Sequence, residues 1–342
     1  MRSERLTLAL HSGVLVLPPE GTIAVFGPQA GEDLGALPRT RVLVVTGFRP
    51  DHDAFTAAGW TCAVQAPEGC AAALVCLPRS REAALSLIAQ AEACVRPDGP
   101  VAVDGQKTDG IEPALKALRT ALPPGALSDP VTKAHGRLAV FAAGAADLSG
   151  WRAWPRIIAD GFTTLPGVFS ADAPDRGSAL LAAALPAHLS GRVIDLGAGW
   201  GYLGRTVLAH PGVTRLDLVE ADAAALDCAR INLTDPRASF HWADATRWKP
   251  AQPADHVVMN PPFHVSRTAD PALGLAFLRA AAAMLRPEGV LWLVANRHLP
   301  YDPALKSLFH TVEDLGTDPA FRLVRASRPV RDGKAPQDRR PT

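Results

Sequence analysis

The sequence predicts an α/β protein made of two tandem domains, each built on a doubly wound, mainly parallel sheet. The first observation is the length of 342 residues, which suits two domains at roughly 150 residues each. The second is the alternation of short apolar strands with helical segments in the second half, the pattern of a parallel sheet. The third is that segments of the first half recur, in the same order, in the second half.

Composition and charge narrow the class of protein. Hydrophobic residues make up 48% of the chain and charged residues 20%, which indicates a globular protein. With 35 basic and 34 acidic residues, the chain lacks the overall positive charge of a general nucleic-acid binder, although a local basic patch stays open. The five cysteines form no CxxC pair, so we expect neither a disulfide scaffold nor a metal site. No segment has the pattern of a membrane span or export signal, and we expect a cytoplasmic protein.

The second half supplies the predicted elements of the main domain, residues 151–330, with a polar tail at 331–342. The predicted strands are Arg192–Asp195, Arg215–Glu220, Ser239–Trp242, Ala254–Met259, Val290–Ala295 and Phe321–Ser327. The predicted helices are Tyr202–His210, Ala221–Leu233 and Leu273–Leu285. Each strand but the last is followed by a helix or turn, so the carboxyl ends of the strands should share one edge of the sheet.

The repeat between the halves favours one fold used twice. The alternative is that the matches are only the turn and helix-end residues common to any two β-α folds. Two pairs of segments match at the same offset: Ala93–Gly105 with Ala283–Ala295, and Pro113–Leu118 with Pro303–Leu308. A third pair is Leu74–Ser80 with His256–Ser266.

The first copy, residues 1–150, is predicted to be degenerate. Its strand Arg41–Thr46 is followed by Gly47-Phe48-Arg49-Pro50 in place of a glycine-rich loop, and its segment Leu77-Pro78-Arg79 has no asparagine. We therefore expect any chemistry in the second copy.

A glycine-rich turn is the strongest local signal of the second half. Gly197, Gly199 and Gly201 follow the strand in the segment VIDLGAGWGYLG. Glycines at a strand-to-helix turn let a ligand approach the backbone and the open amides of the helix start. The alternative is a tight turn without a ligand.

Two carboxylates indicate which ligand this turn would hold. Asp195 precedes the glycines, where it would repel a pyrophosphate but attract an ammonium group. Glu220 ends the next strand, where it can accept hydrogen bonds from both ribose hydroxyls. An amino-acid nucleoside such as S-adenosylmethionine fits these residues better than NAD. Asp244, after the third strand, could accept from the adenine amine, or it could simply cap the next element.

The segment Asn260-Pro261-Pro262-Phe263 is the candidate acceptor site. Two successive prolines stiffen the backbone and remove two donors. The amide oxygen of Asn260 and the carbonyl of Pro261 could then both accept from a planar NH₂ group, and Phe263 could stack on its ring. Such a site catalyses by positioning and electrostatics. The alternative is a proline turn after a buried strand.

Taken together, the chain resembles the class I S-adenosylmethionine-dependent methyltransferases, and within them the bacterial small-subunit rRNA guanine-N2 methyltransferases. The resemblance covers about residues 162–328. It is carried by LPGVFSADAPDRGSALL (Leu165–Leu181), VIDLGAGWGYLG (Val193–Gly204), NPPFH (Asn260–His264) and VANRHLPYDPAL (Val294–Leu305).

The resemblance implies tandem Rossmann-like methyltransferase domains and methyl transfer to a guanine N2 amine in 16S rRNA. The expected partner is the RNA or the small ribosomal subunit, with residues 1–150 serving RNA docking or a structural role. Separately from the resemblance, we expect a monomer. The resemblance also implies that Asp195 and Gly197 line the methionine side, Glu220 holds the ribose, Asp244 meets adenine, and residues 260–263 receive the guanine. The residues themselves also leave open a guanine in 23S rRNA, adenine N6 or a protein glutamine amide as acceptor. A non-catalytic RNA-binding assembly factor is a further alternative.

Overall fold

The structure is a computed structural model that describes residues 2–262 and 271–331, and it contains two compact units. The first unit holds the chain up to Ile157 together with Thr164–Ala171 and Asp222–Ala224. The second holds Ile158–Thr163, Asp172–Ala221 and the chain from Ala225 onward. The segment between the main parts of the two units forms a short ribbon of β8 (Arg156–Ile157) and β9 (Thr163–Thr164).

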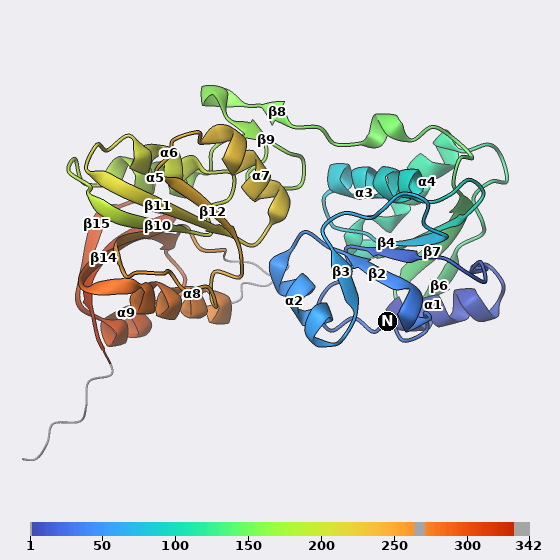
Figure 1. The fold of residues 1–342 in the computed structure, drawn as a ribbon, viewed down its shortest axis with the longest axis horizontal. Coiled ribbons are helices and arrows are strands. Elements are labelled where there is room, and N and C mark those ends of the chain that lie inside the picture. The colour runs from blue at the N-terminus through green and yellow to red at the C-terminus, as the bar shows by residue number, and fades with distance from the viewer. Residues whose placement is uncertain (1, 263–270, 332–342) are drawn as a thin grey trace, which may run out of the picture. The chain divides into compact units, whose positions relative to one another are not determined.

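The first unit is a seven-stranded sheet in the order β3-β2-β1-β4-β5-β7-β6. The strands are β1 (Ile23–Phe26), β2 (Val42–Val45), β3 (Thr61–Ala63), β4 (Ala72–Cys76), β5 (Pro100–Gln106), β6 (Val131–Lys133) and β7 (Gly136–Ala142). The helices are α1 (Arg2–His11), α2 (Arg49–Ala57), α3 (Arg81–Cys94) and α4 (Ile111–Ala121). Helices α3 and α4 cover one face of the sheet, and α1 and α2 cover the other (Figure 1).

The second unit repeats this topology with the strand order β12-β11-β10-β13-β14-β16-β15. The strands are β10 (Gly191–Leu196), β11 (Val213–Glu220), β12 (Ala238–Trp242), β13 (Ala254–Met259), β14 (Leu285–Asn296), β15 (Phe309–Thr317) and β16 (Phe321–Pro329). The helices are α5 (Arg176–Ala184), α6 (Tyr202–Leu208), α7 (Ala223–Asn232), α8 (Pro271–Met284) and α9 (Asp302–Leu308). Helices α5 and α6 pack on one face and α8 and α9 on the other (Figure 1).

In both units the first five strands are parallel to one another, and the last two add an antiparallel edge. Both sheets are buried on both faces, as parallel sheets require, because helices cover each side. Numbered within each unit, the two strand orders are identical. The predicted fold class, one doubly wound fold used twice, is confirmed.

The alignment of the copies by sequence was wrong in one respect. The strand equivalent to β10 is β1, because each is the first strand of its unit and lies between the second and the fourth. The segment around Val42–Val45, predicted above to hold that place, is the second strand. The first unit therefore does have a glycine-containing turn, Gly27 to Gly31, but Gln29 stands where the second unit has Gly199. The four-residue apolar run of β1 is too short to be recognised as a strand by periodicity alone.

Two boundaries at the end of the second unit also differ from the prediction. Residues 309–317 form β15, for which no strand was predicted, because Glu313, Asp314 and Gly316 interrupt any apolar alternation. Strand β14 begins at Leu285 rather than Val290. It passes through residues 286–289, which separate the predicted helix from the predicted strand, with a shift in its register against β13.

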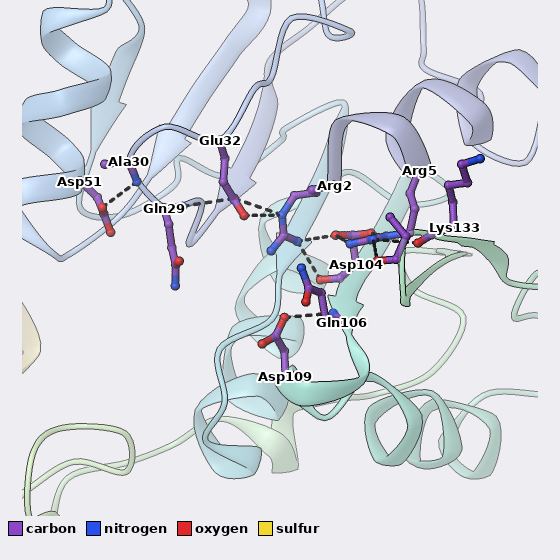
Figure 2. Close-up of polar contacts among 11 residues, drawn as sticks. Arg2, Arg5, Gln29, Ala30, Glu32, Asp51, Asp104, Gln106, Asp109 and Lys133 are labelled. Atoms are coloured by element: carbon purple, nitrogen blue, oxygen red, sulfur yellow. Dashed lines mark hydrogen bonds and ion pairs between the residues drawn. The ribbon is translucent and has the colours of Figure 1, made fainter. Parts of the chain in front are cut away.

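The helix α1 is held to the first unit by a buried network of charges (Figure 2). Arg5 and Asp104 are both fully buried, and the guanidinium donates from Nε to Oδ1 at 2.6 Å and from Nη2 to Oδ2 at 3.0 Å. Arg2 lies between Asp104 Oδ2, at 2.5 Å from its Nη1, and Glu32 Oε1, at 3.0 Å from its Nε. The buried carboxylate of Asp104 is thus compensated by two guanidinium groups.

No helix in the two described ranges combines the length and the apolar character that a bilayer span needs.

Candidate active site

The glycine turn of the second unit joins β10 to α6. Gly197, Gly199 and Gly201 all have positive φ, at 81°, 55° and 91°, a conformation that disfavours side chains. A Cβ on Gly197 would come within 3.3 Å of Phe277, and one on Gly201 within 3.0 Å of Leu233. A Cβ on Gly199 would meet no heavy atom within 4 Å in the described chain. The turn is thus packed against the protein at its two ends and open at its centre.

A neighbouring strand and a neighbouring helix hold this turn in place. The amide of Gly199 donates to Oε2 of Glu220, at the end of β11, over 2.7 Å. On the other side, Asn232 of α7 donates from Nδ2 to the carbonyls of Trp200 and Thr163, each at 2.8 Å. The carboxylate and the amide fix the turn, so its backbone is pre-shaped before a ligand binds.

Asp195 is a fully buried carboxylate beside this turn. Across the described ranges, neither of its oxygens has a hydrogen-bond partner. Burial is the main reason why the pKa of Asp195 is raised to about 7, and the neighbouring Glu220 carboxylate raises it further. The Gly204 amide acts in the opposite direction, although it does not form a hydrogen bond with Asp195. Two carboxylates in such a place are stabilised by a cation. The site therefore suits a ligand that carries an ammonium or sulfonium group.

The acceptor segment begins where β13 ends. The side-chain amide of Asn260 donates from Nδ2 to Oδ2 of Asp175 at 2.7 Å and to Oγ of Ser178 at 2.8 Å. Its Oδ1 is buried and has no hydrogen-bond partner in the described part of the chain. Pro261 is buried and Pro262 is exposed. Phe263 lies outside the described residues, so its stacking role stays a prediction.

The sheet brings the predicted residues to one edge. Strand β10 pairs in parallel with β13, where Asp195 faces Val258, and with β11, where Asp195 faces Leu218. Asp195, Glu220 and Asn260 therefore lie at the carboxyl ends of the adjacent parallel strands β10, β11 and β13. Asp244 follows β12, the next strand along the sheet. This is the edge at which open α/β sheets bind ligands.

Asp244 has a structural role in addition to any role toward a ligand. Its Oδ1 accepts from the backbone amide of Thr246 at 2.9 Å and from the Thr246 hydroxyl at 2.6 Å. These bonds close a turn and do not cap a helix, because the element that follows is strand β13. An adenine amine would have to be met by Oδ2, and the cofactor role of Asp244 stays a prediction.

Sequence reasoning missed Asp175 and Ser178. Asp175 is the N-cap of α5 and accepts from the amide of Ser178 at 2.8 Å. Both residues stand inside the segment Leu165–Leu181 that carries the resemblance, but no role was assigned to them. An aspartate three residues before a serine at the start of a helix signals a cap. Nothing in the sequence signals that the cap also contacts Asn260, 85 residues away.

Comparison with known proteins fits this geometry. The family model of the methyltransferase small domain (MTS) matches residues 160–325. Ribosomal RNA small subunit methyltransferase C of Pseudomonas aeruginosa (strain LESB58) is 34% identical over 77% of this chain and 81% of the relative. The chain belongs to the small-subunit rRNA methyltransferase C family. The resemblance inferred from the sequence is confirmed, and with it the class of enzyme.

Two further comparisons bear on the halves of the chain. Ribosomal RNA large subunit methyltransferase G of Ectopseudomonas mendocina (strain ymp) is 36% identical, but over only 47% of this chain and 44% of the relative. A solved structure titled as the Thermus thermophilus 16S rRNA N2 G1207 methyltransferase in complex with AdoMet and guanosine has a TM-score of 0.76. It is 25% identical, and the match covers 96% of this chain and 91% of that one, so both units of this member of the methyltransferase C family are matched.

Proposed function

We propose that this methyltransferase transfers a methyl group from S-adenosylmethionine to the exocyclic N2 amine of a guanine in 16S rRNA. The observation that carries the proposal is the buried, unpartnered Oδ1 of Asn260, two strands from Glu220 and beside the strand of Asp195. An acceptor atom in that position matches an amine donor. The small-subunit relative and the structure with guanosine support guanine as the base that carries the amine.

The residues at the edge of the sheet fit the cofactor. The carboxylates of Asp195 and Glu220 suit a ligand with positive charge and hydroxyl donors, and the open face of Gly199 lets that ligand approach the backbone. We assign the methionine end to Asp195, Gly197 and Gly201, the ribose to Glu220 and the adenine to Asp244. Bound S-adenosylmethionine supplies an electrophilic methyl group.

The acceptor segment positions the nucleophile. A guanine amine is a weak nucleophile because its lone pair is delocalised into the ring. When Asn260 Oδ1 and the Pro261 carbonyl accept its two N–H groups, the amine is held in one orientation and its lone pair is directed to one side. After transfer, the extra proton can leave to water, so no base is required of the protein. The target base must be exposed or flipped to reach this segment.

The chain offers a reason to prefer 16S over 23S rRNA. The match to the Pseudomonas aeruginosa small-subunit enzyme extends over 77% of this chain and the match to the solved 16S rRNA methyltransferase over 96%, whereas the match to the large-subunit enzyme covers 47%. Both longer matches include at least part of the first unit, so we assign docking on small-subunit RNA to residues 1–150. A ribosomal substrate would place the enzyme in the cytoplasm.

The test is methyl transfer with the purified protein and methyl-labelled S-adenosylmethionine. Assembled 30S particles, free 16S rRNA and 50S particles are offered separately, and the label is mapped by mass spectrometry of nuclease fragments. We expect one N2-methylguanine in 16S rRNA. Label found on 23S rRNA, on adenine or on protein would refute the assignment of the acceptor. Absence of saturable heat on calorimetric titration with S-adenosylmethionine would instead indicate a non-catalytic RNA-binding factor.

A further inference from the structure

The side-chain amide of Asn260 has two different ends, and only one of them can receive an amine. Its oxygen accepts hydrogen bonds and its nitrogen donates them. If the nitrogen faced the guanine amine, two donors would oppose each other and the base would be repelled. The activity of the acceptor segment therefore depends on which end of this amide points at the substrate.

The contacts of Asn260 decide its orientation. Oδ2 of Asp175 lies 2.7 Å from Nδ2, and Oγ of Ser178 lies 2.8 Å from it. An ionised carboxylate can only accept, so the end of the amide that faces Asp175 must be the nitrogen. The oxygen then necessarily faces the other way, where it is buried and without a partner in the described residues.

Asp175 is itself held by the start of α5. The same Oδ2 accepts from the Ser178 amide at 2.8 Å, as the N-cap of the helix. Gly177 allows this tight turn, since a Cβ there would lie 3.0 Å from Oδ2 of Asp175 and 3.0 Å from the ring of Phe321. The helix packs on β14 and β16. The orientation of Asn260 is thus set by the scaffold of the sheet.

We propose that Asp175 and Ser178 are positioning residues that fix the side-chain amide of Asn260 with Oδ1 toward the substrate amine. The proposal rests on the proposed function, because it concerns the same acceptor segment. It goes beyond that function by assigning to the N-terminus of α5 a part in turnover. Neither residue contacts the methyl donor in this account, so their effect is on kcat and not on binding of S-adenosylmethionine.

The first unit supports this assignment as an internal contrast. Helix α1 precedes β1 as α5 precedes β10, and each covers the face opposite the helix that follows the fourth strand. The fourth strand of the first unit is followed by Leu77-Pro78, with no amide to orient, and α1 begins with Arg2 and Arg5 instead of an aspartate and a serine. The two positioning residues and the asparagine are absent together.

The test compares variants that keep the helix cap. In Asp175→Ser the hydroxyl can still cap α5 but is too short to reach Asn260, and Ser178→Ala suits a helix. We expect the double variant to lower kcat by about 100-fold, the scale of a misplaced reacting group. The Kd for S-adenosylmethionine and the thermal midpoint should stay near their wild-type values. Asp175→Asn keeps an oxygen for both contacts and should retain kcat within about threefold.

The control is Asp147→Asn, because Asp147 caps a turn by accepting from the Ser149 amide in the first unit. It should leave kcat unchanged. A double variant with kcat within about threefold of wild type would overturn the proposal. So would a parallel loss of cofactor affinity, or an Asp175→Asn variant as impaired as the double variant.

A second measurement is independent of turnover. In wild type, the side-chain ¹⁵N–¹H₂ signals of Asn260 should show two protons protected from exchange with water, and Ser178→Ala should weaken that protection. Rapid exchange in wild type would overturn the proposal. If wild type methylates another planar amine, the assignment of guanine fails but the kinetic test still applies on that substrate. If it methylates nothing, the NMR signals alone decide the role of Asp175 and Ser178.

Discussion

The two units share one topology, and each has a buried carboxylate in its sheet, but the surroundings of the two carboxylates differ. Asp104 on β5 and Asp195 on β10 are both fully buried. Asp104 has Arg5 and Arg2 at 2.6 and 2.5 Å, whereas neither oxygen of Asp195 has a hydrogen-bond partner among the described residues, and burial with the Glu220 carboxylate raises its pKa to about 7. A buried carboxylate compensated within the chain stabilises the fold, and an uncompensated one reserves its charge for a ligand.

The glycine turns differ in the same sense. In the second unit the amide of Gly199 donates to Glu220 on the next strand. In the first unit, the amide of Gln29 donates to Glu32, three residues further on, over 3.2 Å. The position equivalent to Glu220 is occupied by Thr46. Glu32 is in turn bound to Arg2. The first turn therefore lacks a carboxylate on the neighbouring strand, and we expect one molecule of S-adenosylmethionine per protein.

The largest expected effect comes from breaking the compensated pair. Arg5→Met leaves Asp104 buried with one guanidinium fewer, and we expect a loss of about 3 kcal/mol in the free energy of unfolding of the first unit. Urea unfolding would measure it. Adding Asp104→Leu should restore part of the stability, because the buried carboxylate is then removed and Arg2 keeps its ion pair with Glu32. A single variant as stable as wild type would show that the network contributes little.

The acceptor residue gives the next effect. Asn260→Ala removes Oδ1, and we expect kcat to fall by about 100-fold or more while the Kd for S-adenosylmethionine is unchanged. Pro78→Ala, at the corresponding turn of the first unit, is the matched control and should leave turnover intact. Turnover of Asn260→Ala within about tenfold of wild type would contradict the positioning role.

The uncompensated carboxylate makes stability and binding depend on pH. The native pKa of Asp195, about 7, lies above its usual 3.8, so between these values the folded protein binds more protons than the unfolded one. Stability should fall as pH rises, by roughly 2 kcal/mol between pH 5 and 7, and Asp195→Asn should remove this slope. Thermal unfolding across this range checks it.

Cofactor binding should show the reverse dependence. A cationic ligand favours the ionised carboxylate, so the affinity of wild type for S-adenosylmethionine should rise with pH up to about 7. Asp195→Asn should bind more weakly and with little pH dependence. A wild-type affinity that is constant from pH 5 to 8 would mean that the ligand does not meet this carboxylate.

The smallest expected effect on stability separates the two turns. Gly199→Ala places a side chain at φ 55° with no protein atom within 4 Å, and should cost about 1 kcal/mol of stability. Its Cβ would occupy the open face, so calorimetry should show weakened binding of S-adenosylmethionine. Gln29→Gly in the first unit should leave both the affinity and the stoichiometry unchanged. Binding of a second molecule of S-adenosylmethionine to that variant would mean that Gln29 alone prevents binding at the first turn.

Local sequence patterns sufficed for the architecture and for one side of the site. The alternation of strands and helices and the glycine turn are short-range signals, so the parallel sheet and the position of Asp195 beside Gly197 could be predicted. The proposed acceptor segment could be singled out because Asn260-Pro261-Pro262 follows a strand that the pattern placed correctly, Ala254–Met259.

What could not be predicted depends on contacts between distant residues. Arg5 meets Asp104 across 99 residues, and Asn260 meets Asp175 across 85. From sequence alone, a charged residue such as Arg5 is expected to be exposed to solvent. A helix-capping residue such as Asp175 is expected to contact only its own helix. The wrong alignment of the first unit has the same origin, since β1 becomes recognisable only through its pairing with β2 and β4.

The Arg5–Asp104 pair makes helix α1 part of the core of the first unit. Because both groups are fully buried, α1 cannot detach from the sheet without separating two paired charges. Local opening of this helix should therefore be rare, and its backbone amides should exchange with solvent only when the whole unit unfolds.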